Sequence, residues 1–167
     1  MTTAAPTATV LVAGIGNIFH SDDGFGPEVV RRLPRAPESV RAVDYGIRGL
    51  HLAYDLLDPW DALVLVDAIP DRGDPGQVEV IRVDPAVDTS GVERGGPDLD
   101  GHGMDPAAVF AGVWALGGTL PPTYVVGCQI ESVAEGIGLS GPVAAAVETG
   151  VTAVLDVVER LTGERRE

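Results

Sequence analysis

Apolar residues along the chain form short continuous runs that are separated by stretches of helical spacing. Residues 8–13 (ATVLVA) and 62–66 (ALVLV) are apolar and rich in β-branched side chains, which is typical of strands buried on both faces. Residues 40–44 predict a third strand, and apolar positions recur at helical spacing over 25–33 and 50–57. This β-α-β-α-β order predicts an α/β fold with a parallel sheet and helices on both of its faces.

The second half of the chain also predicts alternating strands and helices, but one of its strands alternates polar and apolar residues instead of being apolar throughout. Residues 76–83 (GQVEVIRV) alternate polar and apolar side chains, which predicts a strand at the margin of the sheet. Residues 84–103 are rich in Pro, Gly and Asp without any period, and long loops of this kind are usually functional or mobile. A helix over 106–116, a last strand over 124–128 and a closing helix over 142–161 complete the prediction.

Composition fits one soluble domain. The 167 residues show a single compositional regime, so we expect one domain over 1–167 with an ordered core from about 8 to 162. The only cysteine, Cys128, excludes a disulfide framework and a cysteine-rich zinc ribbon. Neither an export signal nor a membrane span is expected, because the N-terminus has no basic start and no apolar stretch is long enough. We therefore expect a cytoplasmic protein that does not associate with a membrane.

Charge narrows the range of partners. The chain has 25 acidic residues against 11 basic ones, a formal net charge of -14, and its basic residues are all arginines. Binding to nucleic acid phosphates needs clustered positive charge, so we expect no nucleic acid partner. An acidic surface would instead attract a cation or a basic segment of a partner.

Candidate functional residues lie where the predicted strands end. In parallel open sheets, the loops that follow neighbouring strands meet at one edge, and functional groups gather there. Glycines at these positions would serve turns that need a positive φ, amide side chains would hold loops, and Asp22 would cap the helix that follows. The candidates are Gly14, Gly16, Asn17, Asp22, Asp23 and Gly24; Asp44, Gly46 and Gly49; Asp67; Gln129 and Glu131; and His102 in the long loop.

Two common kinds of site fit these residues poorly. A dinucleotide site would use Gly14 and Gly16, but Phe19 occupies the third glycine position and Asp44 lies about 28 residues past Gly16 instead of the usual ~20. Without lysine, a Walker-type loop is excluded as well. A serine nucleophile lacks its Gly-x-Ser-x-Gly elbow, and Cys128 lies in an apolar strand, where a small buried residue is the simpler interpretation.

A metal site is the third candidate. Asp23 and Asp67 follow neighbouring strands, and His102 belongs to a loop that can cover the same edge. Such a mixed oxygen and nitrogen set suits zinc, nickel or a similar ion and leaves coordination positions open. No local motif such as His-Glu-x-x-His supports it, so Asp23 as an acid at a helix start and His102 as an exposed loop residue remain alternatives.

Four segments together resemble the hydrogenase maturation endopeptidase family. They are GIGNIFHSDDGFGPEVVRRL, LVLVDAIPDRGDPGQVEVI, DGHGMDPAAVFA and VVGCQIESVAEGIGLSGPVAAAVE. The resemblance runs in order from about Thr9 to Leu161. It implies a three-layer α/β/α sandwich whose mostly parallel, mixed five-stranded sheet has one antiparallel edge strand.

The resemblance also implies an activity and a site. Members of the family remove a C-terminal extension from the large-subunit precursor of a nickel-iron hydrogenase after nickel insertion. Carried over by motif, the metal-binding residues are Asp23, Asp67 and His102, and the nickel is carried by the substrate, with zinc or cadmium able to replace it. A non-catalytic metallochaperone or docking module for the precursor, or another hydrolase of the same architecture, are the alternatives.

Two positions differ from what is common in the family. Asp23 stands where glutamate is frequent, so a bound metal would sit about 1 Å deeper. Arg48 stands where small residues are frequent. Because a guanidinium group recognises carboxylates, Arg48 predicts a subgroup with its own substrate.

Overall fold

The computed structural model describes residues 7–83 and 105–163. Their strands form one sheet in the order β2-β1-β3-β5-β4, in which every neighbouring pair is parallel except β4 and β5. The expected mostly parallel, mixed five-stranded sheet with an antiparallel edge strand is confirmed. The strands are β1 (Val10–Ile15), β2 (Val40–Gly46), β3 (Ala62–Ile69), β4 (Val78–Val83) and β5 (Thr123–Gln129).

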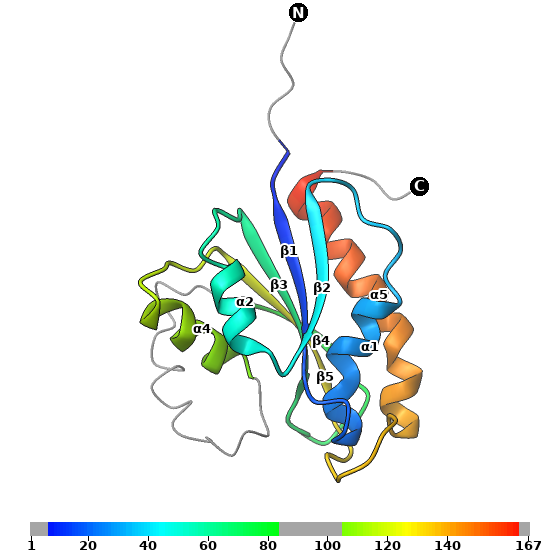
Figure 1. Cartoon of the computed structure of the whole chain (residues 1–167). Coiled ribbons are helices and arrows are strands. Elements are labelled where there is room, and N and C mark those ends of the chain that lie inside the picture. The colour runs from blue at the N-terminus through cyan, green and yellow to red at the C-terminus, as the bar shows by residue number, and fades with distance from the viewer. Residues whose placement is uncertain (1–6, 84–104, 164–167) are drawn as a thin grey trace, which may run out of the picture.

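Helices cover both faces of this sheet, as Figure 1 shows. Helices α1 (Phe25–Arg31) and α5 (Gly141–Thr162) lie on one face, and α2 (Gly49–Asp55) and α4 (Pro106–Ala115) lie on the other. Alternate residues of β1 point to opposite faces, so Val10 and Val12 pack with α1 and α5, whereas Leu11 packs with α2 and α4. The result is the expected three-layer α/β/α sandwich.

Local sequence signals set the start of α4 and the end of α5. Asp105 caps α4 by accepting a hydrogen bond from the Ala108 N–H at 2.8 Å, and Pro106 occupies the first turn. Gly163 ends α5 in the left-handed conformation, with φ 73°. A short 3₁₀ helix, η1 (Ser21–Gly24), precedes α1. The predicted long loop, 84–103, lies outside the described residues.

Strand β3 extends further than its apolar run predicts. The prediction ends it at residue 66, but pairing with β5 continues through Asp67 opposite Gly127 and Ile69 opposite Gln129. The extension depends on the neighbouring strand, which the local sequence does not reveal. Asp67 is therefore inside a strand of the ladder and not in the loop after it.

Helix α5 is long and apolar enough to cross a membrane by length and composition. Its valines, however, pack against β1, β3 and α1 in the core on one side of the sheet, as in the core helix of a soluble protein. The buried members are Val143, Val147, Val154, Val157 and Val158.

Candidate active site

Asp67 lies close to the carboxyl edge of the sheet, and its side chain is only 3% exposed. Leu63 and Leu65 pack on the face covered by α2 and α4, so alternation places Asp67 on that face too. Its Oδ1 accepts a hydrogen bond from the Ala68 N–H at 2.8 Å. Burial raises the pKa of Asp67 well above its usual value, the charges of Asp23 and Asp105 raise it further, and the Ala68 N–H lowers it.

Asp23 belongs to η1, which follows β1, and is half-buried. Its Oδ2 accepts a hydrogen bond from the Asn17 N–H at 2.8 Å. Burial raises the pKa of Asp23, while the Asn17 N–H and the charge of His20 lower it. Gly16, with φ 136°, makes the close approach of η1 to β1 possible, because a Cβ there would lie 1.9 Å from the Asp23 carbonyl oxygen.

Asp23 and Asp67 are thus brought together closely enough for the charge of one to raise the pKa of the other. Within residues 7–83 and 105–163, no arginine forms an ion pair with either carboxylate, and no group of three His, Cys, Asp or Glu side chains is placed to hold a metal. His102 lies outside the described residues, so its part in the site stays a prediction. A buried and a half-buried acid with raised pKa values can hold a proton or bind a cation.

Asp22 does not cap α1, contrary to the prediction; the N-cap of that helix is Gly24, without a side-chain bond. The Asp22 carboxylate is fully buried and joins η1 to the loop after β5. Its Oδ2 accepts from the Glu131 and Ser132 N–H groups, both at 2.9 Å, and from the Ser140 hydroxyl at 2.9 Å; its Oδ1 accepts from the Ser140 N–H at 2.7 Å. Burial alone would raise the pKa of Asp22, but these bonds outweigh it and lower the pKa.

The turn from β2 to α2 completes this edge of the sheet. Asp44 pairs in register with Gly14, and Gly46 turns the chain with φ 57° before α2 begins at Gly49. The Arg48 guanidinium donates to two main-chain carbonyls, from Nη2 to Asp44 at 2.7 Å and from Nε to Tyr45 at 3.2 Å.

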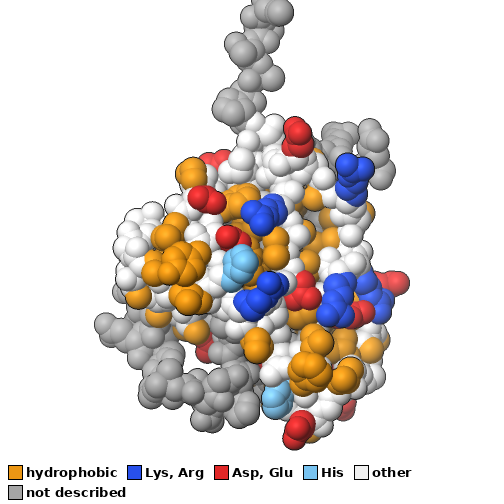
Figure 2. Space-filling view, viewed as in Figure 1, with side chains coloured by type: hydrophobic (Ala, Val, Ile, Leu, Met, Phe, Trp, Pro, Cys, Tyr) orange, Lys and Arg blue, Asp and Glu red, His pale blue; other side chains and the backbone are white. Residues whose placement is uncertain are grey.

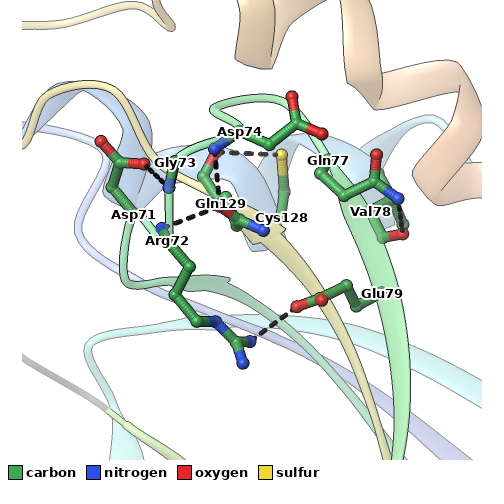
Figure 3. A network of polar contacts seen from close by, with 9 residues as sticks. All are labelled: Asp71, Arg72, Gly73, Asp74, Gln77, Val78, Glu79, Cys128 and Gln129. Carbon is green, nitrogen blue, oxygen red and sulfur yellow. Dashed lines mark hydrogen bonds and ion pairs between the residues drawn. The ribbon is translucent and has the colours of Figure 1, made fainter.

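Gln129 has a structural role on the other side of the site. Figure 3 shows its side chain beneath the loop between β3 and β4, where Oε1 accepts from the Arg72 N–H at 2.8 Å and the Asp74 N–H at 3.1 Å. Arg72 also forms an ion pair with Glu79 at 2.6 Å. The predicted candidate Gln129 therefore fixes the loop that follows Asp67, and Glu131 contributes its N–H to Asp22.

The sequence interpretation missed two residues near the pair of acids. His20 precedes Asp23 by three residues, and its charge lowers the pKa of Asp23. Asp105, at the start of α4, raises the pKa of Asp67. The capping pattern of Asp105 before Pro106 predicts a helix start, but only the sheet topology brings that start to the carboxyl edge.

Cys128 is fully buried, in agreement with its interpretation as a small core residue. Burial and the charge of Asp22 raise its pKa to about 11. We predict that iodoacetamide at pH 8 alkylates Cys128 in the folded protein at least about 100-fold more slowly than a free thiol, whose usual pKa is ~8.5. Mass spectrometry before and after unfolding in urea measures this. Rapid alkylation of the folded protein would contradict a buried thiol.

Comparisons with known proteins agree with this architecture. Residues 27–157 match the family model described as "HycI: Hydrogenase maturation protease". The chain is 31% identical over 154 residues to the hydrogenase expression/formation protein HupD of Rhizobium leguminosarum bv. viciae, covering 87% of this chain and 74% of HupD. It is 29% identical over 152 residues to the hydrogenase 2 maturation protease of Escherichia coli, covering 87% and 88%. The solved structure of the maturating endopeptidase HybD from E. coli superposes with a TM-score of 0.71 at 28% identity, covering 91% of this chain and 93% of HybD.

Proposed function

The chain belongs to the hydrogenase maturation protease family, and we propose that it removes the C-terminal extension from the large-subunit precursor of a nickel-iron hydrogenase after nickel insertion. The family supports a protease that acts in hydrogenase maturation. We propose in addition that the substrate is the large-subunit precursor and that the protein recognises it by its bound nickel. A cytoplasmic setting belongs to it as well.

The pairing of Asp23 with Asp67 is the observation that carries the proposal. Burial raises the pKa of both carboxyls, the charge of Asp23 raises that of Asp67 further, and the charge of His20 offsets the effect at Asp23 only in part. A divalent cation would replace the protons and supply the missing charge. His102, three residues before Asp105 in the sequence, would be the third ligand, and Asp105 is electrostatically coupled to Asp67.

In this proposal the metal arrives with the substrate. Asp23, Asp67 and His102 would bind nickel that is already seated in the precursor, so an empty precursor would lack the group that these residues recognise. A metal held by such ligands can polarise a carbonyl or lower the pKa of a bound water toward ~7. Zinc or cadmium would fit the same mixed oxygen and nitrogen donors. The Asn17 N–H holds Asp23 in place at 2.8 Å, and Gln129 anchors the loop beyond Asp67.

Mass spectrometry of the precursor tests the function. The purified protein is incubated with nickel-loaded and with nickel-free large-subunit precursor, and the mass of each is followed. We expect the loaded precursor alone to lose a C-terminal segment. Equal shortening of both forms would exclude nickel recognition, and stable binding without shortening would indicate a docking module instead.

His102 provides a second test of the site. We predict that His102→Gln lowers kcat/KM for the nickel-loaded precursor by about 100-fold, because a metal ligand is lost. His51→Gln is the matched control, since His51 is an exposed residue of α2 close to Asp55. Cleavage assays that show equal activity for both variants would remove His102 from the site.

A further inference from the structure

A hollow of about 280 Å³ opens at the carboxyl edge of the sheet, and Asn17 of its lining is hydrogen-bonded to Asp23. The loop after β1 forms one wall and the turn between β2 and α2 forms the other. Asn17 belongs to the first wall, and its N–H holds the Asp23 carboxylate at 2.8 Å. The lining residues are Gly16, Asn17, Ile18, Phe19, Arg31, Asp44, Tyr45, Gly46, Ile47 and Arg48.

The charge of this lining is opposite to that of the whole chain. It contains two guanidinium groups and one carboxylate, whereas the chain has a formal net charge of -14. Asp44 already forms an ion pair with Arg31 at 3.4 Å, so its charge is compensated within the wall. Figure 2 shows basic side chains over α1 and over the β2 and α2 side of the molecule, with acidic and hydrophobic side chains between them.

Arg48 is fixed in the wall but lacks an anion. Its Nη2 and Nε donate to main-chain carbonyls, which hold the planar group in one orientation. Among the described residues, no carboxylate lies within ion-pair distance of Arg48, and its Nη1 has no hydrogen-bond partner. A guanidinium group held in this way has donors left for a carboxylate.

The size and rim of the hollow fit a peptide better than a cofactor. Its volume is at the lower end of the roughly 300–1,000 Å³ of most small-molecule sites, which leaves room for about one or two side chains. Phe19 and Ile47 at the rim are 56% and 58% exposed, and large exposed apolar side chains are typical anchors for a protein partner.

We propose that this hollow is a specificity subsite in which Arg48 binds a carboxylate of the protein substrate. The inference rests on the proposed function, because the substrate is the hydrogenase precursor whose cleavage site would lie at the neighbouring Asp23. The carboxylate belongs either to an acidic side chain in the removed segment or to the C-terminus of that segment. Both present the same anion to the guanidinium group.

Steady-state kinetics of Arg48→Gln test the proposal. With nickel-loaded precursor, we expect KM to rise about tenfold and kcat to change less than twofold, because a charged hydrogen bond of binding is lost. Arg41→Gln is the matched control, since Arg41 is exposed on β2, carries the same charge and does not line the hollow. Arg48→Lys, which keeps the charge but loses the planar fork, should recover part of the affinity.

Altered precursors identify the source of the carboxylate. In one precursor the acidic residues of the C-terminal extension are changed to amides, and in the other a neutral Gly-Ser-Gly extension displaces the terminal carboxylate. For the precursor that lacks the recognised group, the KM of the wild-type protein should rise about tenfold. Arg48→Gln should then cause no further rise in KM with that precursor. If Arg48→Gln has the same KM as the wild-type protein, the subsite is overturned. It is also overturned if Arg48→Gln still raises KM about tenfold on both altered precursors.

Measuring the affinity for the precursor tests the subsite independently of the proposed protease activity. The dissociation constant of the nickel-loaded precursor is measured for wild type and Arg48→Gln by calorimetry, which needs no cleavage. A tenfold weaker complex supports the subsite even if no shortening occurs, in which case only the proposed protease activity fails. Equal affinity together with normal cleavage would refute the subsite alone.

Discussion

Replacing Asp67 with asparagine is expected to lower kcat/KM for the nickel-loaded precursor on the order of 10³-fold. The carboxylate is the buried member of the acidic pair, and a neutral amide can neither replace its charge nor bind a divalent ion comparably. The folded structure should be retained, because asparagine has the same shape. Asp58→Asn, an exposed site with the same loss of charge, is the control. Cleavage by Asp67→Asn at the wild-type rate would exclude the acidic pair as the site.

The same substitution should stabilise the protein. Because the pKa of Asp67 is raised by folding, the folded state binds more protons between the unfolded and folded pKa values, and the free energy of unfolding falls as pH rises through that window. Asparagine removes this loss, so the melting temperature at pH 7 should rise by about 2–8 °C. Thermal unfolding from pH 4 to pH 8 measures the effect. A lower melting temperature for Asp67→Asn would show that the buried charge is compensated.

Replacing Asp22 with alanine is expected to lower the free energy of unfolding by about 3–5 kcal/mol, a large part of the ~5–15 kcal/mol typical of a domain. The reason is that three main-chain N–H groups and the Ser140 hydroxyl lose their acceptor in the interior. Cleavage should fall as well, because Asp23 is the next residue and depends on the same turn. Urea unfolding monitored by circular dichroism measures the stability.

Asp71→Ala is the control for Asp22. Asp71 is exposed, and its Oδ1 accepts one main-chain N–H, from Gly73 at 2.8 Å, so its loss should cost at most about 1 kcal/mol. The pKa of Asp22 is lowered by folding, so its contribution is complete above the unfolded pKa near ~3.9 and is lost as pH falls through the folded pKa. The difference between wild type and Asp22→Ala should therefore shrink in acid. A constant difference would contradict an ionised Asp22.

The sheet could be predicted from sequence because the composition of each strand reflects how far its two faces are buried. Residues 62–66 are apolar because both faces of β3 are covered, whereas β4, at the edge of the sheet, has mixed polar and apolar residues and none that is fully buried. The end of β3 could not be predicted in the same way. Asp67 is polar, and only its pairing with Gly127 keeps it in the ladder and buries it.

The candidate site was predictable to the same extent. The rule that strand ends converge was sufficient to group Asp23 with Asp67, and the structure places them within electrostatic reach. The partners of Asp22 were not predictable, because they lie 109 to 118 residues away and no local pattern marks them. The hollow beside Arg48 was hidden too, since Phe19 and Ile47 belong to polar turns whose exposure depends on how two loops meet.

The bond between Asp22 and Ser140 also sets an order of events during synthesis. A ribosome adds about 5–20 residues per second, so about 6–24 s pass between the emergence of these two residues, which are 118 positions apart. Throughout that interval the Asp22 carboxylate lacks the two Ser140 donors, and the turn that carries Asp23 depends on local bonds such as that from the Asn17 N–H. A nascent chain released before residue 140 would therefore lack the two Ser140 donors that hold Asp22 beside the turn that carries Asp23.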